Sequence, residues 1–192
     1  MSLVLKSNLG ETHNAVLFQE NMLTKKVVLP INKIHSNMKS VLQSYLNFNY
    51  TGKCFEEGYI EKNSIKIISY TNGLCVSDTL EFHVVFTCNI CIVSDNMMLE
   101  CKIENKNLSG IKCNVILNKI IGDEEEYEDK KQEKEDNVSE AIVIFCSRDH
   151  HYGNDMFNSV EVNDKILVKV IGSKYELFDD YICVIGKFIK KT

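Results

Sequence analysis

The sequence predicts an α+β fold that is mostly β. Three observations carry this prediction: one apolar stripe with helical spacing, a long segment in which apolar and polar residues alternate, and five short strand-like segments in the C-terminal half. The number and spacing of those five segments are typical of a five-stranded OB-fold barrel. We therefore expect a bent antiparallel sheet with one helix, followed by an OB-fold barrel.

The beginning of the chain has the weakest pattern. Residues 1–22 show no sustained period and are interpreted as a leader, with one strand expected near Ala15–Phe18. A second short strand is expected at Lys26–Leu29. Pro30 should end it, because proline cannot donate a hydrogen bond to a sheet ladder.

The predicted helix follows this strand. Its apolar residues lie at i, i+3, i+4, i+7 and i+8, the spacing of an amphipathic helix. They are Met38, Val41, Leu42, Tyr45 and Leu46. Ser36 or Asn37 can cap the first turn by accepting a hydrogen bond from a free backbone N–H. Gly52 lies beyond the end of the helix and breaks it.

After Gly52 the pattern is almost entirely β. Apolar residues alternate from Leu80 to Ile92, which predicts one long strand, or two joined by a bend, with one buried face. Short strands are expected before it at Tyr59–Ile60 and Ser64–Ser69, with a turn at Thr71–Gly73. The five barrel strands are expected at Leu99–Ile103, Ile111–Leu117, Ala141–Cys146, Ile166–Ile171 and Tyr181–Phe188.

The negative charge of the chain is concentrated in one short run. Residues 123–136 carry nine acidic and three basic side chains, a net charge of −6, so the rest of the chain carries a net charge of +1. The run has no aliphatic residue and is expected to be a solvated insertion between two barrel strands. A docking site for a basic partner is the alternative. Nucleic-acid binding would need a local basic patch, because the remaining charge is nearly neutral.

Length and composition exclude several classes of protein. A chain of 192 residues forms one medium domain or two small ones. No apolar run approaches the ~18 residues of a membrane helix, and the N-terminus lacks the pattern of a secretory signal. A cytosolic or nuclear location is expected, where the eight cysteines stay reduced.

Cys88 and Cys91 have a zinc-ligand spacing, C-x-x-C. Residues three apart on a strand point to opposite faces, so these thiols cannot converge unless the strand breaks there. Cys88, Cys101 and Cys113 fall on the buried phase of their strands, where cysteine packs as a small apolar side chain. We expect core cysteines, no metal and no cofactor. A small zinc-binding regulator is the alternative.

The segment Cys146–His151 places a thiol, a carboxylate and two imidazoles within six residues. Nucleophilic catalysis needs the nucleophile and its base within hydrogen-bond reach, and side chains at the end of a strand diverge. The sequence also lacks a Gly-x-Ser-x-Gly elbow and a phosphate-binding glycine loop. We expect a polar loop here and no catalytic residue.

The predicted barrel has one candidate nucleic-acid face. By strand alternation Lys102 and Lys112 point outward, Lys106 lies in the turn between their strands, and Arg148 and His150 follow the third strand. An OB-fold binds single strands with such a face, placing basic groups on phosphates and aromatic rings on bases. Aromatic residues are scarce here, so the expected RNA affinity is weak. An ordinary solvated face is the alternative.

Several segments occur in the order and spacing of one known family. They are Lys26–Met38, Met38–Leu46, Gly52–Ile60, Asn72–Leu74, Glu81–Phe86, Val162–Lys174 and Ile182–Gly186. In this order they resemble the larger stalk subunit of archaeal and eukaryotic DNA-directed RNA polymerases, the seventh-subunit family of RNA polymerase II. The divergent, asparagine- and lysine-rich sequence is most similar to the versions carried by large DNA viruses.

The resemblance implies a leader at 1–22 without a family counterpart, an N-terminal docking domain at 23–93 and an RNA-binding type of OB-fold at 94–192. It implies a non-catalytic transcription subunit that docks on the largest polymerase subunits, at the base of the clamp. The docking residues would be Gly52, Gly58, Tyr59, Ile60 and Gly73.

The same resemblance names the other partners. Nascent RNA would be bound weakly, a smaller stalk subunit would be a further protein partner, and no membrane would be involved. A viral version would work in the host cytoplasm and be carried in the virion, and a cellular version would work in the nucleus. The alternative function is a free-standing OB-fold RNA-binding protein.

Overall fold

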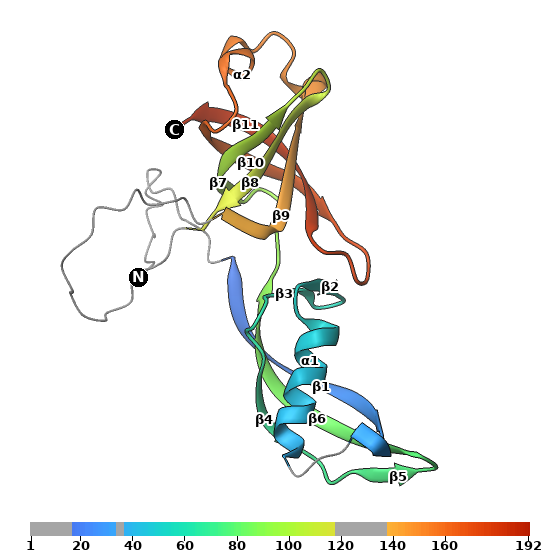
Figure 1. The fold of residues 1–192 in the computed structure, drawn as a ribbon. Helices are drawn as coiled ribbons and strands as arrows, with labels where there is room; N and C mark the ends of the chain where they lie inside the picture. Colours follow the sequence, from blue (N-terminus) through green and yellow to red (C-terminus); the bar gives the residue numbers. More distant parts are fainter. Residues whose placement is uncertain (1–16, 34–36, 118–137) are drawn as a thin grey trace, which may run out of the picture.

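The computed structural model describes residues 17–33, 37–117 and 138–192. These residues form two β-structures placed end to end, so the molecule is elongated (Figure 1). An open sheet with a helix on one face forms the N-terminal half, and a closed five-stranded barrel forms the C-terminal half. The predicted fold class is confirmed. The acidic run at 123–136 lies outside the described residues.

Two long strands form the frame of the open sheet. β1 (Phe18–Pro30) and β6 (Thr79–Cys91) pair antiparallel over all 13 residues of each. β5, β4 and β3 pair in turn along the other side of β6, and β2 pairs with β3. These short strands are β2 (Lys53–Phe55), β3 (Gly58–Ile60), β4 (Lys66–Tyr70) and β5 (Leu74–Val76).

β1 is longer than the sequence predicts. Pro30 ends it as expected, but the strand already begins at Phe18. Residues 18–22 therefore belong to the sheet, opposite residues 87–91 of β6, and are not part of a separate leader.

The predicted helix is α1 (Met38–Tyr50), which covers one face of the open sheet. Leu42 and Leu46 are completely buried in the core between helix and sheet. Asn37 is the N-cap, because its side chain accepts a hydrogen bond from the Ser40 N–H at 3.3 Å. Gly52 follows the helix at a φ of 74°, in the left-handed region that glycine adopts readily.

The barrel has the strand order of an OB-fold. Its strands follow one another as β7-β8-β9-β11-β10, β10 closes on β7, and β9 and β11 run parallel. Their bounds are β7 (Met98–Lys106), β8 (Gly110–Ile116), β9 (Val138–Ser147), β10 (Lys165–Lys174) and β11 (Ile182–Lys191). All five coincide with predicted strands. A short helix, α2 (Asp155–Ser159), lies between β9 and β10 and was not predicted.

The two halves are packed against each other at their junction. Cys54 and Tyr59 of the open sheet belong to the same buried cluster as the interior of the barrel. The loop between β10 and β11, residues 175–181, reaches β2 (Figure 1). There the Phe178 N–H donates to the Cys54 carbonyl, and the Cys54 N–H donates to the Asp179 carbonyl, both at 2.8 Å.

Candidate docking end and nucleic-acid interface

The structure places the predicted docking residues in two separate groups. Gly58, Tyr59 and Ile60 form β3, which pairs with the end of β6 nearest the barrel. Gly52 lies beside them, because its N–H donates to the Ile60 carbonyl at 2.8 Å. Gly73 precedes β5, which pairs with the opposite end of β6. The five residues therefore do not form one surface (Figure 1).

The first group is buried: Tyr59 belongs to the core shared with the barrel, and Ile60 belongs to the core between α1 and the open sheet. Tyr59 is 3% exposed and Ile60 is completely buried. Burial raises the pKa of the Tyr59 phenol. A Cβ at Gly58 would lie 2.6 Å from the Cys91 carbonyl oxygen, so only glycine lets β3 approach β6 this closely. Tyr59 therefore packs the open sheet against the barrel, and Gly58 and Ile60 hold β3 on β6. A charged residue in place of Tyr59 would disrupt the fold, so a loss of docking in that variant would not show that Tyr59 contacts a partner.

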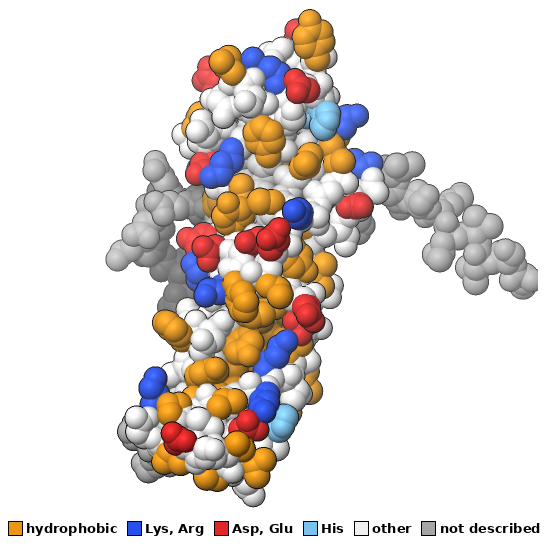
Figure 2. Space-filling model, turned by 90° about the vertical axis from the view of Figure 1, so that its right-hand side faces the viewer, with side chains coloured by type: hydrophobic (Ala, Val, Ile, Leu, Met, Phe, Trp, Pro, Cys, Tyr) orange, Lys and Arg blue, Asp and Glu red, His pale blue; other side chains and the backbone are white. Residues whose placement is uncertain are grey.

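The group around Gly73 lies at an exposed apolar end. Leu74 is 64% exposed, Val76 44% and Ile31 48%. Ile31 begins the short 3-10 turn η1 (Ile31–Lys33), and its N–H donates to the Asp78 carbonyl at 3.0 Å, which ties this turn to the turn after β5. We call Ile31, Leu74 and Val76 the apolar end. Figure 2 shows hydrophobic side chains gathered over the half of the molecule that holds α1 and the open sheet.

Sequence reasoning missed the side chains of the apolar end. All three residues of β5 are exposed, so the strand has no alternation of buried and exposed positions that a periodic pattern could reveal. The only available signal was the turn at Gly73, which located the end but not the residues that project from it.

Lys102 and Lys112 lie on the outside of the barrel as predicted. Lys102 is opposite Asn114 in the pairing of β7 with β8, and Lys112 is opposite Phe145 in the pairing of β8 with β9. The Lys112 ammonium is 2.8 Å from a Glu104 carboxylate oxygen. Because both side chains are exposed, this ion pair is weak, but it lowers the positive charge that Lys112 offers to a phosphate.

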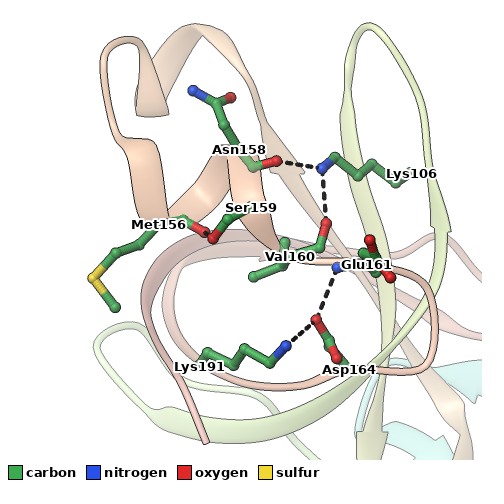
Figure 3. A network of polar contacts seen from close by, with 8 residues as sticks. All are labelled: Lys106, Met156, Asn158, Ser159, Val160, Glu161, Asp164 and Lys191. Carbon is green, nitrogen blue, oxygen red and sulfur yellow. Dashed lines mark hydrogen bonds and ion pairs between the residues drawn. The ribbon is translucent and has the colours of Figure 1, made fainter.

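Backbone carbonyls at the end of α2 hold the Lys106 ammonium, so it is not directed into solvent. The ammonium donates to the carbonyls of Asn158 and Val160, both at 2.7 Å, and so caps the C-terminal end of α2 (Figure 3). Beside it, Asp164 accepts from the Glu161 N–H at 2.8 Å and from Lys191 at 2.6 Å. The hydrogen bond from Lys191 holds the pKa of Asp164 below its usual value. The network is structural, so Lys106 is a poor candidate for binding RNA.

Arg148 and His150 lie where β9 ends. The Arg148 guanidinium donates to the Asn107 carbonyl at 3.4 Å, and its backbone N–H donates to the Ser109 carbonyl at 2.9 Å. Arg148 therefore positions the loop between β7 and β8. His150 is exposed in the 3-10 turn η2 (Asp149–His151).

Two exposed aromatic residues near this face were not predicted. Phe145 is 37% exposed on β9, beside Lys112, and Tyr152 is 94% exposed after η2. Phe145 could have been found from alternation, because its neighbours Ile144 and Cys146 are both completely buried. An aromatic ring beside a lysine is the arrangement that stacks a base and holds its phosphate.

The β10–β11 loop packs against β2 of the open sheet. In OB-folds this loop and the β7–β8 loop commonly frame the oligonucleotide site. Here the Phe178 ring packs edge-on against Phe55 of β2, with 5.4 Å between ring centroids. The loop also carries three carboxylates, Glu176, Asp179 and Asp180, which repel phosphate. Nucleic acid would therefore be limited to the outer face of β8 and β9 and the β7–β8 loop.

The cysteines of the C-x-x-C pair point into different cores. Cys88 belongs to the core between α1 and the open sheet, and Cys91 belongs to the core shared with the barrel. This confirms that the two thiols point to opposite faces of β6. Burial raises the pKa of Cys88 to about 11 and that of Cys91 to about 12. In the part of the chain that the structure describes, no group of three metal-ligating side chains comes together.

No known family model matches the chain, and no curated protein matches it in sequence. Among residues 17–33, 37–117 and 138–192, no helix is both long and apolar enough to cross a bilayer.

Proposed function

We propose that this protein is a non-catalytic stalk subunit of a multisubunit DNA-directed RNA polymerase. The observation that carries the proposal is the build of the molecule: an OB-fold barrel is packed onto an open sheet whose far end exposes Ile31, Leu74 and Val76. The order of sequence segments, which resembles the larger stalk subunit of such enzymes, supplies the identity of the partner.

In this proposal the apolar end docks on the largest polymerase subunits at the base of the clamp. Covering exposed apolar side chains such as Leu74 and Val76 removes apolar surface from water, which favours binding of a partner at this end. The barrel then projects outward, with Phe145 and Lys112 near the path of the nascent transcript. A smaller stalk subunit would be a further partner. The subunit acts by binding, and no residue performs chemistry.

The features of the barrel favour weak RNA binding. Lys112 is paired with Glu104, Lys106 is held by carbonyls at the end of α2, and the β10–β11 loop is acidic and packed on β2. Few phosphates can therefore be neutralised, and each phosphate contact contributes only about 0.7 to the slope of log affinity against log salt for a single strand.

A free-standing OB-fold RNA-binding protein is the second candidate. Phe145 beside Lys112 on the outer face of β8 and β9 favours it, since this pair could stack and hold one nucleotide without any polymerase.

Affinity purification of tagged variants tests the proposal. Leu74→Asp combined with Val76→Asp places two charges on the apolar end, where both side chains are exposed, so the fold should survive. The two largest polymerase subunits should no longer co-purify with this variant. The matched control is Leu108→Asp, at an 85% exposed position in the β7–β8 loop, which should retain them. Equal recovery by both variants would contradict docking through the apolar end. Absence of polymerase from the wild-type purification, with RNA retained, would favour the second candidate.

A further inference from the structure

β1 is an edge strand along its whole length. Its pairing with β6 is continuous from Phe18 to Pro30, without a bulge. Among the described residues no strand pairs with its other edge. Thirteen residues leave a row of backbone N–H and C=O groups over roughly 43 Å. The barrel, in contrast, is closed, and backbone hydrogen bonds to the β10–β11 loop engage Cys54 of β2.

Three hollows follow one another along this same strand. Each is lined by an odd-numbered residue of β1, and odd-numbered residues such as Val27 face α1. These lining residues are Leu29, Lys25 and Gln19, and the volumes of the three hollows are, in the same order, about 560, 440 and 250 Å³. The first two meet, because Tyr45 and Asn49 of α1 line both.

Apolar and polar side chains line the hollows together, and lysines outnumber carboxylates among the charged groups, which gives a basic rim. Phe48, 83% exposed, and Val41 line the hollow at Leu29. Phe55 and Phe178 line the hollow at Lys25, and Ile92 and Met97 line the hollow at Gln19. The charged groups of the linings are Lys33, Lys25, Lys53 and Glu56. Lys25 is paired with Glu57 at 2.8 Å. Lys33 follows β1 directly in η1, and Lys53 of β2 lines the same hollow as Lys25, so these two lysines are the cations that the hollows offer to a bound segment.

We propose that the free edge of β1 binds an extended segment of a partner protein as an added strand. The main chain of that segment would pair with β1, and every second side chain would enter the hollows beside Leu29, Lys25 and Gln19. The segment alternates in character: apolar side chains fill the hollows, and carboxylates reach Lys33 and Lys53. This inference goes beyond the proposed function and does not depend on it: the site runs along β1 toward the barrel and adjoins the apolar end only at Leu29 and Lys33.

A second copy of this chain is a poorer occupant. In a symmetric pair, the odd-numbered residues of one β1 would enter the hollows of the other. Lys25 of each copy would then have to leave its ion pair with Glu57 and approach a rim that already carries Lys33 and Lys53. The like charges disfavour this pairing, whereas an acidic segment gains from the same rim.

Two synthetic peptides of roughly ten residues test the proposal. Both alternate threonine with leucine and glutamate, and the second is N-methylated at every second amide. Binding to the full chain is followed by fluorescence anisotropy, and protection of backbone amides by hydrogen exchange. The first peptide should bind and should slow exchange in residues 18–30. The N-methylated peptide keeps the side chains but cannot complete the ladder, so its affinity should fall at least about tenfold.

A charge exchange identifies the rim. Lys33→Glu and Lys53→Glu should each lower the affinity for the glutamate peptide by roughly fivefold. Each should raise the affinity for a matched peptide with lysine in place of glutamate. Lys66→Glu, at an exposed position on β4 away from the hollows, is the control and should change neither affinity. The proposal would be overturned if the N-methylated peptide bound as tightly as the first peptide, or if the peptide protected amides outside β1. It would also be overturned if sedimentation showed that the free chain is a dimer and that the peptide dissociates this dimer.

Discussion

His151 and His150 are adjacent in the sequence but have opposite environments. His150 is exposed, whereas His151 is 4% exposed and its ring stacks on Phe157 with 4.4 Å between centroids. The Phe188 N–H donates to His151 Nε2 at 2.8 Å, so Nδ1 carries the proton and donates to the Ser147 carbonyl at 2.7 Å. His151 therefore joins the end of β9 to β11.

The first prediction concerns this histidine. His151→Phe keeps a ring against Phe157 but leaves the buried Phe188 N–H without an acceptor. The free energy of unfolding should fall by about 1–3 kcal/mol, measured by urea denaturation. His150→Phe is the control and should change stability by less than about 0.5 kcal/mol. Similar stability of the two variants would mean that these hydrogen bonds contribute little.

The second prediction concerns the thiols. Cys75 and Cys183 are exposed, and the other cysteines that the structure describes are buried. Burial raises the pKa of Cys54 to about 11, so its reactive thiolate is scarce near neutral pH. A thiol reagent at pH 8 should label Cys75 and Cys183 of the folded chain quickly, and the buried thiols only after denaturant is added. Mass spectrometry counts the labels, and rapid labelling of a third cysteine would contradict the described burial.

At the scale of elements, the third prediction concerns α2. Lys106→Met keeps the aliphatic stem but removes the donors to Asn158 and Val160. It should destabilise the chain by about 1 kcal/mol and speed amide exchange in residues 155–160. Lys112→Met on the next strand is the control for stability, because exposed ion pairs contribute little.

The same pair of variants separates structure from RNA binding. If RNA binds the outer face, Lys112→Met should flatten the salt slope by about 0.7 and Lys106→Met should not. A change of slope in Lys106→Met alone would restore Lys106 as an RNA contact and would contradict its structural role.

The sequence predicts the elements well where burial is periodic. α1, β6 and the five barrel strands each bury one face, so their apolar residues repeat with the period of the element. The first half of β1 gives no such signal, because Gln19, Glu20 and Met22 are all exposed and the hollows leave that part of the strand uncovered. α2 has five residues, which is too short for a helical period to be seen.

At the scale of the whole molecule, sequence reasoning identified the two halves but not how their loops meet. The sequence predicts a helix end at Gly52 and a turn at Gly73, and the resemblance names Gly58 with them as a docking residue. Their separation depends on where β3 and β5 pair along the 13 residues of β6, and no local pattern specifies that register. The packing of Phe178 on Phe55 is equally invisible in the sequence, although it determines that the β10–β11 loop serves the junction.

At the scale of the whole molecule, the proposed docking through the apolar end, and not through the barrel, can be tested directly. The two exposed thiols lie in the two halves, Cys75 on β5 and Cys183 on β11, so each can carry a thiol-linked photo-crosslinker alone. Cys183→Ser leaves the probe on Cys75, and Cys75→Ser leaves it on Cys183. Each labelled chain is incorporated into polymerase, irradiated and analysed by mass spectrometry. The Cys75 probe should crosslink to the two largest polymerase subunits, and the Cys183 probe should not. Crosslinks to those subunits from Cys183 alone, or from neither position, would contradict the account.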